Sequence, residues 1–336
     1  MIPTVVVLAA GMSTRYGRLK QLEPVGPEGE ALLDYTVFDA RRAGFSRIVL
    51  IIREELEEAF RAHIDPRWPS DLDIVFHFQR PEALPGSKIR EGDGSRLARL
   101  LQDRRKPWGT AHALLSAREL LPDPFVVLNA DDFYGHSAFA LGASLIGSGM
   151  APNPWDPPAF GLVAYTLVDT LTRNGGVSRG LCTVDPAGWL EGVEELLDVR
   201  QEGASIIGST LSGRDLRLSG REPVSTNFWI LAPGIFSYLE AGFWDFLVGL
   251  TLQPREAEGS GNPETTREPE FLIPTQVNRL LESGKARVRV FPSCDRFLGI
   301  THPQDWDWVA AGLRALTETG QYPAPLWGSN SGRAAS

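Results

Sequence analysis

The chain has 336 residues, of which 43% are hydrophobic, enough for one large α/β domain or two smaller ones with a substantial core. Its formal net charge of −9 argues against a nucleic acid as the main partner, since a phosphate backbone attracts a basic surface. The two cysteines, Cys182 and Cys294, form neither a metal-ligand spacing nor a disulfide framework, which favours the reducing cytoplasm.

The chain begins with an apolar stretch, residues 2–10, that is short and lacks a positively charged start. It therefore predicts a first strand and not a signal peptide. No apolar run reaches the roughly 18 residues that cross a membrane, so we expect no membrane span and no membrane partner.

Strand and helix patterns alternate through the first half of the chain. In chain order we expect strand 5–8, helix 32–43, strand 47–52, helix 54–63, strand 72–78, helix 111–121 and strand 124–129. Near-continuous apolar strands separated by helices are typical of a mostly parallel sheet with helices on both faces. The pattern predicts a Rossmann-like α/β fold with no β-helix tail.

The second half predicts further strands and helices, which we expect to extend the same sheet in antiparallel fashion. The expected strands are 160–165, 178–184, 189–195, 224–231 and 286–291, and the expected helices are 235–241, 272–282 and 305–316. Three stretches rich in Pro, Gly or charge predict irregular insertions, at 81–107, 151–158 and 254–268.

The loop after the first strand suits a polyphosphate. Small residues let the backbone N–H groups approach one anion, and hydroxyls and cations follow them. In order these residues are Leu8, Ala9, Ala10, Gly11, Ser13, Thr14, Arg15 and Lys20. The spacing fits neither a Walker loop nor a dinucleotide fingerprint, because Gly17 comes six residues after Gly11 and is followed by Arg18.

This loop resembles the nucleotidyltransferase signature, Leu-Ala-Ala-Gly-x-(Gly/Ser)-Thr-Arg followed shortly by Lys. The resemblance implies that the loop, including Gly11, Ser13 and Thr14, wraps the triphosphate of an NTP. Arg15 would neutralise the β- and γ-phosphates, and Lys20 would bridge the α-phosphate and an acceptor phosphate. The fold implied is that of nucleotide-diphospho-sugar transferases.

Asp131 and Asp132 follow the strand 124–129 directly. Ligands of open parallel sheets bind beyond the carboxyl ends of the strands, where a carboxylate can hold Mg²⁺ against phosphates. An ordinary turn or helix-cap role is the alternative. The segment resembles the family's Asn-Gly-Asp motif, which implies that Asp131 is the catalytic Mg²⁺ ligand and that Asp132 supports or caps.

Two segments are expected to recognise the nucleotide base. Gly109 and Thr110 resemble the family's Gly-Thr-Ala-x-Ala turn, where Thr110 would also cap the following helix. Gln79 directly follows the strand 72–78. The resemblance implies that its amide meets the edge of the base, and because an amide can both donate and accept, it suits the pyrimidine of UTP, dTTP or CTP. His112 on the same helix is expected to be structural.

The resemblance is looser in the acceptor half. Gly176, Glu195 and Asn227 are the expected acceptor-binding residues. Leu196 replaces the lysine that family members carry after the glutamate, so a cation for the acceptor phosphate must come from elsewhere. Gly299 stands where the family has its second metal-binding aspartate. Either Asn227 or a water fills that position, or the metal is held in a different arrangement.

Together these motifs predict a catalytic domain at 1–317, with an NTP-binding half at 1–135, an acceptor half at 159–317 and a C-terminal extension at 318–336 whose last residues are disordered. The expected activity is transfer of a nucleotidyl group from an NTP to a sugar 1-phosphate, with release of pyrophosphate. Two alternatives stay open: a cytidylyltransferase that acts on phosphocholine or molybdopterin, and an inactive nucleotide-binding regulator. The sequence leaves the oligomeric state open.

Overall fold

A computed structural model describes residues 2–11, 19–81, 97, 104, 106–148, 158–252 and 268–328. Of the predicted phosphate loop, Ser13, Thr14 and Arg15 lie outside these described residues, as do most of the three predicted insertions and the last residues of the chain.

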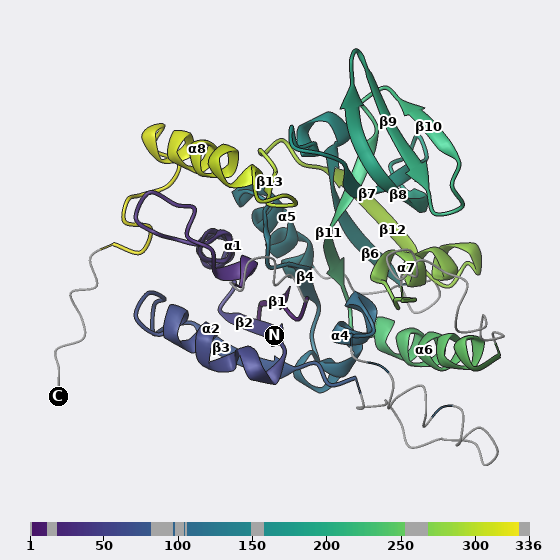
Figure 1. The fold of residues 1–336 in the computed structure, drawn as a ribbon. Helices are drawn as coiled ribbons and strands as arrows, with labels where there is room; N and C mark the ends of the chain where they lie inside the picture. The colour runs from purple at the N-terminus through teal and green to yellow at the C-terminus, as the bar shows by residue number, and fades with distance from the viewer. Residues whose placement is uncertain are drawn as a thin grey trace.

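An 11-stranded mixed sheet forms the centre of the molecule (Figure 1). Its parallel part has β1 (Thr4–Leu8) between β2 (Arg47–Ile52) and β4 (Phe125–Asn129), with β3 (Asp73–Phe78) beyond β2. The strands at the centre of this part are buried on both faces, as expected from their continuous β-branched residues.

Antiparallel strands extend the sheet on the other side of β4. Next to β4 lies β11 (Pro223–Leu231), and β11 pairs with both β6 (Ala159–Thr166) and β7 (Val177–Val184). The remaining strands are β8 (Leu190–Glu202), β9 (Ser205–Thr210) and β10 (Asp215–Leu218) beyond β7, and β12 (Arg287–Pro292) beside β6. The expectation of one sheet with antiparallel additions is confirmed.

Helices cover both faces of the sheet (Figure 1). On one face α1 (Leu32–Arg42), α2 (Glu57–Ile64) and α5 (His136–Gly147) share a core with Val5 and Val7. On the other, α4 (Thr110–Ser116), α6 (Ile235–Leu252) and α7 (Ile273–Glu282) share a core with Val6. The predicted Rossmann-like α/β fold is thereby confirmed, because alternate residues of one strand are buried in two separate cores, one on each face of the sheet.

A two-stranded ribbon joins the end of the chain to the sheet. β5 (Asp132–Phe133) pairs antiparallel with β13 (Leu298–Gly299), and α8 (Asp305–Glu318) follows. After α8 the chain packs back onto α1, where Tyr322 and Leu326 are buried in a third core. The ribbon therefore links the predicted metal motif to the C-terminal part of the chain.

Some elements differ from the sequence expectation. Helix α5 was not expected, because its sequence has no charged residues and follows Gly135 instead of a Ser, Thr or Asp cap. β8 runs seven residues past Glu195, and the short strands β9 and β10 were missed. The predicted helix 54–63 begins as the 3₁₀ turn Glu54–Leu56, and the helix predicted at 111–121 ends as the 3₁₀ turn Arg118–Leu120.

Helix α6 is longer than the predicted 235–241, and by length and composition alone it could cross a membrane. It escaped the search for an unbroken apolar run because it contains Glu240 and Asp245. In this structure Leu239 and Phe243 are buried in the core that α6 shares with α4 and α7, and Glu240 accepts a hydrogen bond from Arg118. Helix α6 therefore serves here as a covering helix of the sheet.

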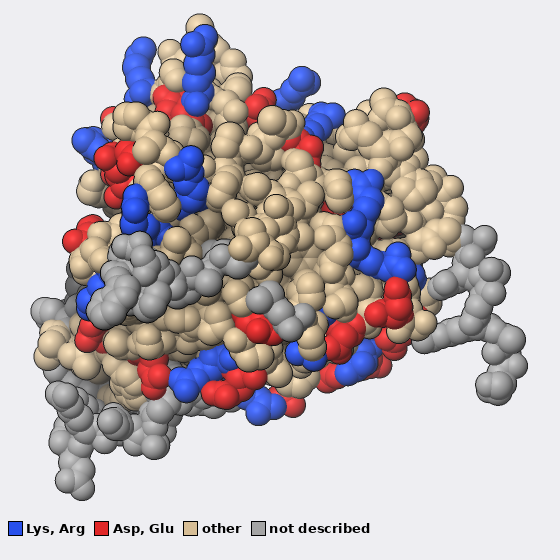
Figure 2. Space-filling view, turned by 180° about the vertical axis from the view of Figure 1, so that it is seen from behind, with Lys and Arg blue, Asp and Glu red and all other residues tan. Residues whose placement is uncertain are grey.

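Basic and acidic side chains are mixed over the described surface that Figure 2 shows. Over the described residues as a whole, exposed ion pairs join Arg41 with Asp71 and Arg80 with Glu54. On this face the described residues therefore form no broad basic surface of the kind that binds a nucleic acid backbone.

Candidate functional site

The parallel register of the central strands places two predicted motifs side by side. Leu8, at the end of β1, lies opposite Asn129, at the end of β4. The N–H of Ala130 donates to the carbonyl of Leu8 at 3.2 Å, so the segment that follows each strand starts at the same edge of the sheet. This is the edge at which ligands bind in open α/β sheets.

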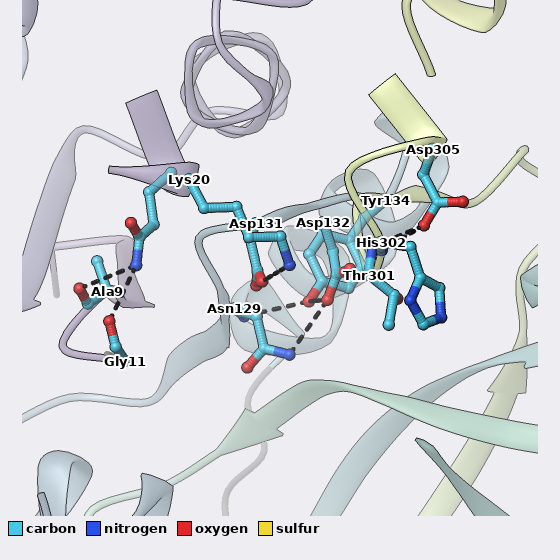
Figure 3. A network of polar contacts seen from close by, with 11 residues as sticks. Ala9, Gly11, Lys20, Asn129, Asp131, Asp132, Tyr134, Thr301, His302 and Asp305 are labelled. Carbon is cyan, nitrogen blue, oxygen red and sulfur yellow. Dashed lines mark hydrogen bonds and ion pairs between the residues drawn. The ribbon is translucent and has the colours of Figure 1, made fainter. Parts of the chain in front are cut away.

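An ion pair connects these two segments. Lys20 begins the 3₁₀ turn Lys20–Leu22, and its Nζ donates to Asp131 Oδ2 at 2.7 Å (Figure 3). Both side chains are partly exposed, at 21% for Lys20 and 33% for Asp131. Two residues that are 111 positions apart and were predicted to be catalytic thus meet at one point.

Gln21, which the sequence analysis did not single out, holds the start of the phosphate loop. Its buried Nε2 lies 3.5 Å from the carbonyl of Ala9 and 3.4 Å from that of Gly11. These bonds orient the two carbonyls toward Gln21. The signal in the sequence was its position directly after Lys20.

Asp132 lies in a polar network beside the ion pair. Its Oδ2 accepts from Asn129 Nδ2 at 3.1 Å and from the Tyr134 hydroxyl at 3.4 Å (Figure 3). Burial, together with repulsion from Asp131, raises the pKa of Asp132 to about 6, while Arg179 and Lys20 act in the opposite direction. Asp132 is thus a carboxylate held in place by its neighbours.

Gly299 faces Asp132 across the ribbon. The two residues are paired in β5 and β13, and a Cβ at position 299 would lie 2.6 Å from Asp132 Oδ1. A side chain there would force Asp132 to move. The glycine that replaces the family's aspartate is therefore explained by the carboxylate of Asp132, which occupies the space beside it.

Asn227 lies at the centre of a second chain of hydrogen bonds. Its Nδ2 donates to Asn129 Oδ1 at 2.8 Å, and its Oδ1 accepts from Trp229 Nε1 at 2.9 Å. It has a φ of +70° at a break in the β11–β6 register, a left-handed conformation that asparagine tolerates better than most residues. Both polar atoms of the Asn227 amide are therefore already engaged within the protein.

A cavity of about 180 Å³ opens next to this network. Of the predicted residues it brings together Thr110, Glu195 and Asn227. Gly176 is elsewhere, with its carbonyl 2.9 Å from His302 Nε2, and Gly180, which pairs with Glu195 in β7–β8, takes its place. The cavity is lined by Thr110, Asn129, Asp132, Ser178, Arg179, Gly180, Glu195, Ser225, Thr226, Asn227, Leu272 and Pro274.

The predicted base-binding residues form a tight cluster at the end of β3. Gln79 is buried, and its Nε2 lies 3.2 Å from the Gly109 carbonyl and 3.1 Å from His112 Nδ1. Its amide nitrogen is thus bound within the protein. His112 is 1% exposed and contacts Gln79, in keeping with the expected structural role.

The Gly109–Thr110 turn is positioned by the segment before α7. Gly109 has a φ of +109° and precedes α4, and the Thr110 hydroxyl accepts from the N–H of Ile273 at 3.1 Å. The expectation that Thr110 caps the helix through its side chain is wrong, because Thr110 is the first helical residue and Gly109 is the cap. Its hydroxyl joins two helix starts instead.

A family model matches the N-terminal part of the chain. Residues 5–140 match the model described as the MobA-like NTP transferase domain. This range contains the loop after β1, Lys20 and Asp131, so the resemblance to nucleotidyltransferases is confirmed. No curated protein sequence gives a significant match to the chain.

Solved structures share the fold over nearly the whole chain. HddC from Yersinia pseudotuberculosis is 13% identical with a TM-score of 0.52, over 92% of this chain and 99% of that one. A putative glucose-1-phosphate thymidylyltransferase from Bacillus anthracis is 12% identical with a TM-score of 0.54, over 94% and 96%. The UDP-glucose pyrophosphorylase from Acinetobacter baumanii is 16% identical with a TM-score of 0.53, over 96% and 98%.

Proposed function

We propose that this chain transfers a nucleotidyl group from an NTP to a sugar 1-phosphate and releases pyrophosphate. The observation that supports this best is the 2.7 Å contact between Lys20 and Asp131, beside a polar cavity that holds Glu195 and Asn227. A cation and a carboxylate meet where a nucleotide loop ends, and an acceptor site lies next to them. The Bacillus anthracis and Acinetobacter baumanii proteins share this fold, and they are named as a putative glucose-1-phosphate thymidylyltransferase and a UDP-glucose pyrophosphorylase.

The residues would act mainly by positioning and by neutralising charge. A phosphate oxygen of the acceptor attacks the α-phosphorus in line, and pyrophosphate leaves. Lys20 would stabilise the α-phosphate and the incoming phosphate together, and Arg15 would stabilise the leaving pyrophosphate. Glu195 and Asn227 would bind hydroxyl groups of the acceptor, while Gln79, Gly109 and Thr110 would lie toward the base.

Mg²⁺ fits the donor set at this edge of the sheet. The ion favours one or two carboxylates, with water and phosphate oxygens as the other ligands. Asp131 and Asp132 are adjacent carboxylates, and no hydrogen bond from the described residues reaches Asp132 Oδ1. These two residues would hold the ion, which when bound would supply charge neutralisation on the α-phosphate. Asp132 thereby takes the position that the sequence analysis gave to Asn227.

A non-sugar acceptor is the second candidate, and two observations favour it. The matching family model is described as MobA-like, and Leu196 is fully buried where a sugar-phosphate lysine was sought. The same attack on the α-phosphorus would then serve phosphocholine or molybdopterin. The two candidates share the nucleotide chemistry and differ only in what fills the cavity.

A pyrophosphate-release assay with Mg²⁺, the four NTPs and a panel of phosphorylated acceptors tests the proposal. Release that depends on a sugar 1-phosphate supports it. Release with phosphocholine or a molybdopterin phosphate supports the second candidate. NTP binding without release from any acceptor would show an inactive nucleotide-binding regulator instead.

A further inference from the structure

Arg179 is the only lysine or arginine among the described residues that line the acceptor cavity. It lies on β7, which runs antiparallel to the strand that carries Glu195. Its partner on the neighbouring strand β8 is Leu196, so β8 contributes an apolar side chain opposite Arg179. Among the described lining residues, Arg179 is therefore the one that offers a positive charge to a ligand inside this cavity.

The guanidinium of Arg179 is held firmly in one place. Its Nη1 donates to the carbonyl of Ser178 at 2.8 Å, and its Nη2 donates to the carbonyl of Thr170 at 2.6 Å. Its central carbon lies 5.3 Å from the centre of the Phe297 ring, within the range of a cation–π contact. A group fixed by two carbonyls and a ring loses little conformational entropy when it binds a ligand.

Arg179 is nevertheless short of partners for its charge. Among the described residues, no carboxylate forms an ion pair with it, and its buried Nε has no hydrogen-bond partner. Burial lowers the pKa of the guanidinium, while the charges of Asp132 and Glu195 act in the opposite direction from a greater distance. A partly buried cation with a donor left unbonded is costly unless an anion completes its coordination.

We propose that Arg179 binds the phosphate monoester of the acceptor and selects phosphorylated acceptors. This inference rests on the proposed function. Its Nε and the remaining N–H groups of its fork match the oxygens of a phosphate. The charge lies near Asp131 and Asp132, where the attacking phosphate must approach. Arg179 thus supplies the cation that Leu196 does not.

The test measures ligand binding directly. Inorganic phosphate, glucose 1-phosphate and phosphocholine are titrated into wild type, Arg179→Gln and Arg179→Lys by calorimetry, and Mg²⁺–NTP is titrated separately. Loss of charged hydrogen bonds should weaken phosphate-ester binding by about 10- to 100-fold in Arg179→Gln, with NTP affinity within about twofold of wild type. Arg179→Lys should recover part of the loss, because it keeps the charge and loses the fork.

Arg173→Gln is the matched control, since it removes one positive charge from an exposed position six residues away. It should bind every probe as wild type does. Thermal unfolding of each variant verifies the fold, and Arg179→Lys carries the test if Arg179→Gln does not fold.

Two outcomes would overturn the Arg179 assignment while leaving the proposed function intact. One is undiminished phosphate-ester binding by folded Arg179→Gln, or by Arg179→Lys if only that variant folds. The other is wild type that binds NTP and releases pyrophosphate without measurable affinity for any of the phosphate esters. Failure of wild type to bind NTP would instead remove the proposed function and the assignment together.

Discussion

Lys20 Nζ lies 2.7 Å from Asp131 Oδ2, and this contact joins the segment after β1 to the segment after β4. Because both side chains are partly exposed, the ion pair contributes little to folding stability. In the proposed function, nucleotide and metal would separate the two groups and pair each with a new partner.

Lys20→Ala should therefore lower kcat/KM for pyrophosphate release by about 100- to 1,000-fold, the usual effect of removing one preorganised electrostatic group. The melting temperature should change by no more than about 2 °C. Steady-state kinetics and thermal unfolding measure both. Lys285→Ala, at an exposed lysine away from the site, should match wild type. Lys20→Ala activity within about tenfold of wild type would contradict the role of Lys20.

Gly299→Asp should not create a better metal site, although it restores the residue typical of the family. The new Cβ would lie 2.6 Å from Asp132 Oδ1 and push that carboxylate away. We expect weaker Mn²⁺ binding by electron paramagnetic resonance than in wild type. The double variant Asp132→Ser with Gly299→Asp should recover binding, because the two residues compete for one space. Tighter binding by the single Gly299→Asp variant would refute this explanation.

The sequence predicted the parallel half of the sheet well because its strands are buried on both faces and need continuous apolar residues. It also predicted that the segments carrying Lys20 and Asp131 face each other, because parallel strands bring their carboxyl ends to one edge. It could not predict that Gly180 lines the cavity, since the place of this residue depends on the pairing of β7 with β8. The φ of Asn227 and the contact of Gly299 with Asp132 likewise depend on tertiary register, which has no local sequence signal.

Gly109→Ala should destabilise the protein by about 1–3 kcal/mol or more. A Cβ at Gly109 would lie 2.7 Å from the carbonyl oxygen of Phe271, and the φ of +109° is strained for any side chain. Gly147→Ala, at the end of α5 with open space around it, is the control and should be neutral or slightly stabilising. Urea unfolding of both variants measures the difference, and equal midpoints would contradict the assigned close approach.

Asp39 should make the free energy of unfolding depend on pH. It is 1% exposed, and it accepts a hydrogen bond from the Tyr322 hydroxyl at 2.6 Å. Burial is the larger effect and raises its pKa from 3.8 to about 7, against the opposing influence of Tyr322 and Arg42. Between these values the unfolded chain has released the proton and the folded chain keeps it, so the stabilisation present at low pH is lost as the pH rises through about 7.

Asp39→Asn removes this titration and keeps the shape of the side chain. The difference in unfolding free energy between Asp39→Asn and wild type should therefore shift in favour of the variant as the pH rises from 4.5 to 8. Urea unfolding at several pH values measures it. A difference that stays constant over this range would show that Asp39 has an ordinary pKa.

A crystal structure of the chain with Mg²⁺ and an NTP tests the central claim most directly. We expect the triphosphate beyond the carboxyl ends of β1 and β4, with Lys20 moved from Asp131 onto a phosphate oxygen and Asp131 on the ion. A nucleotide bound elsewhere, or a Lys20–Asp131 ion pair that persists beside a bound triphosphate, would contradict it.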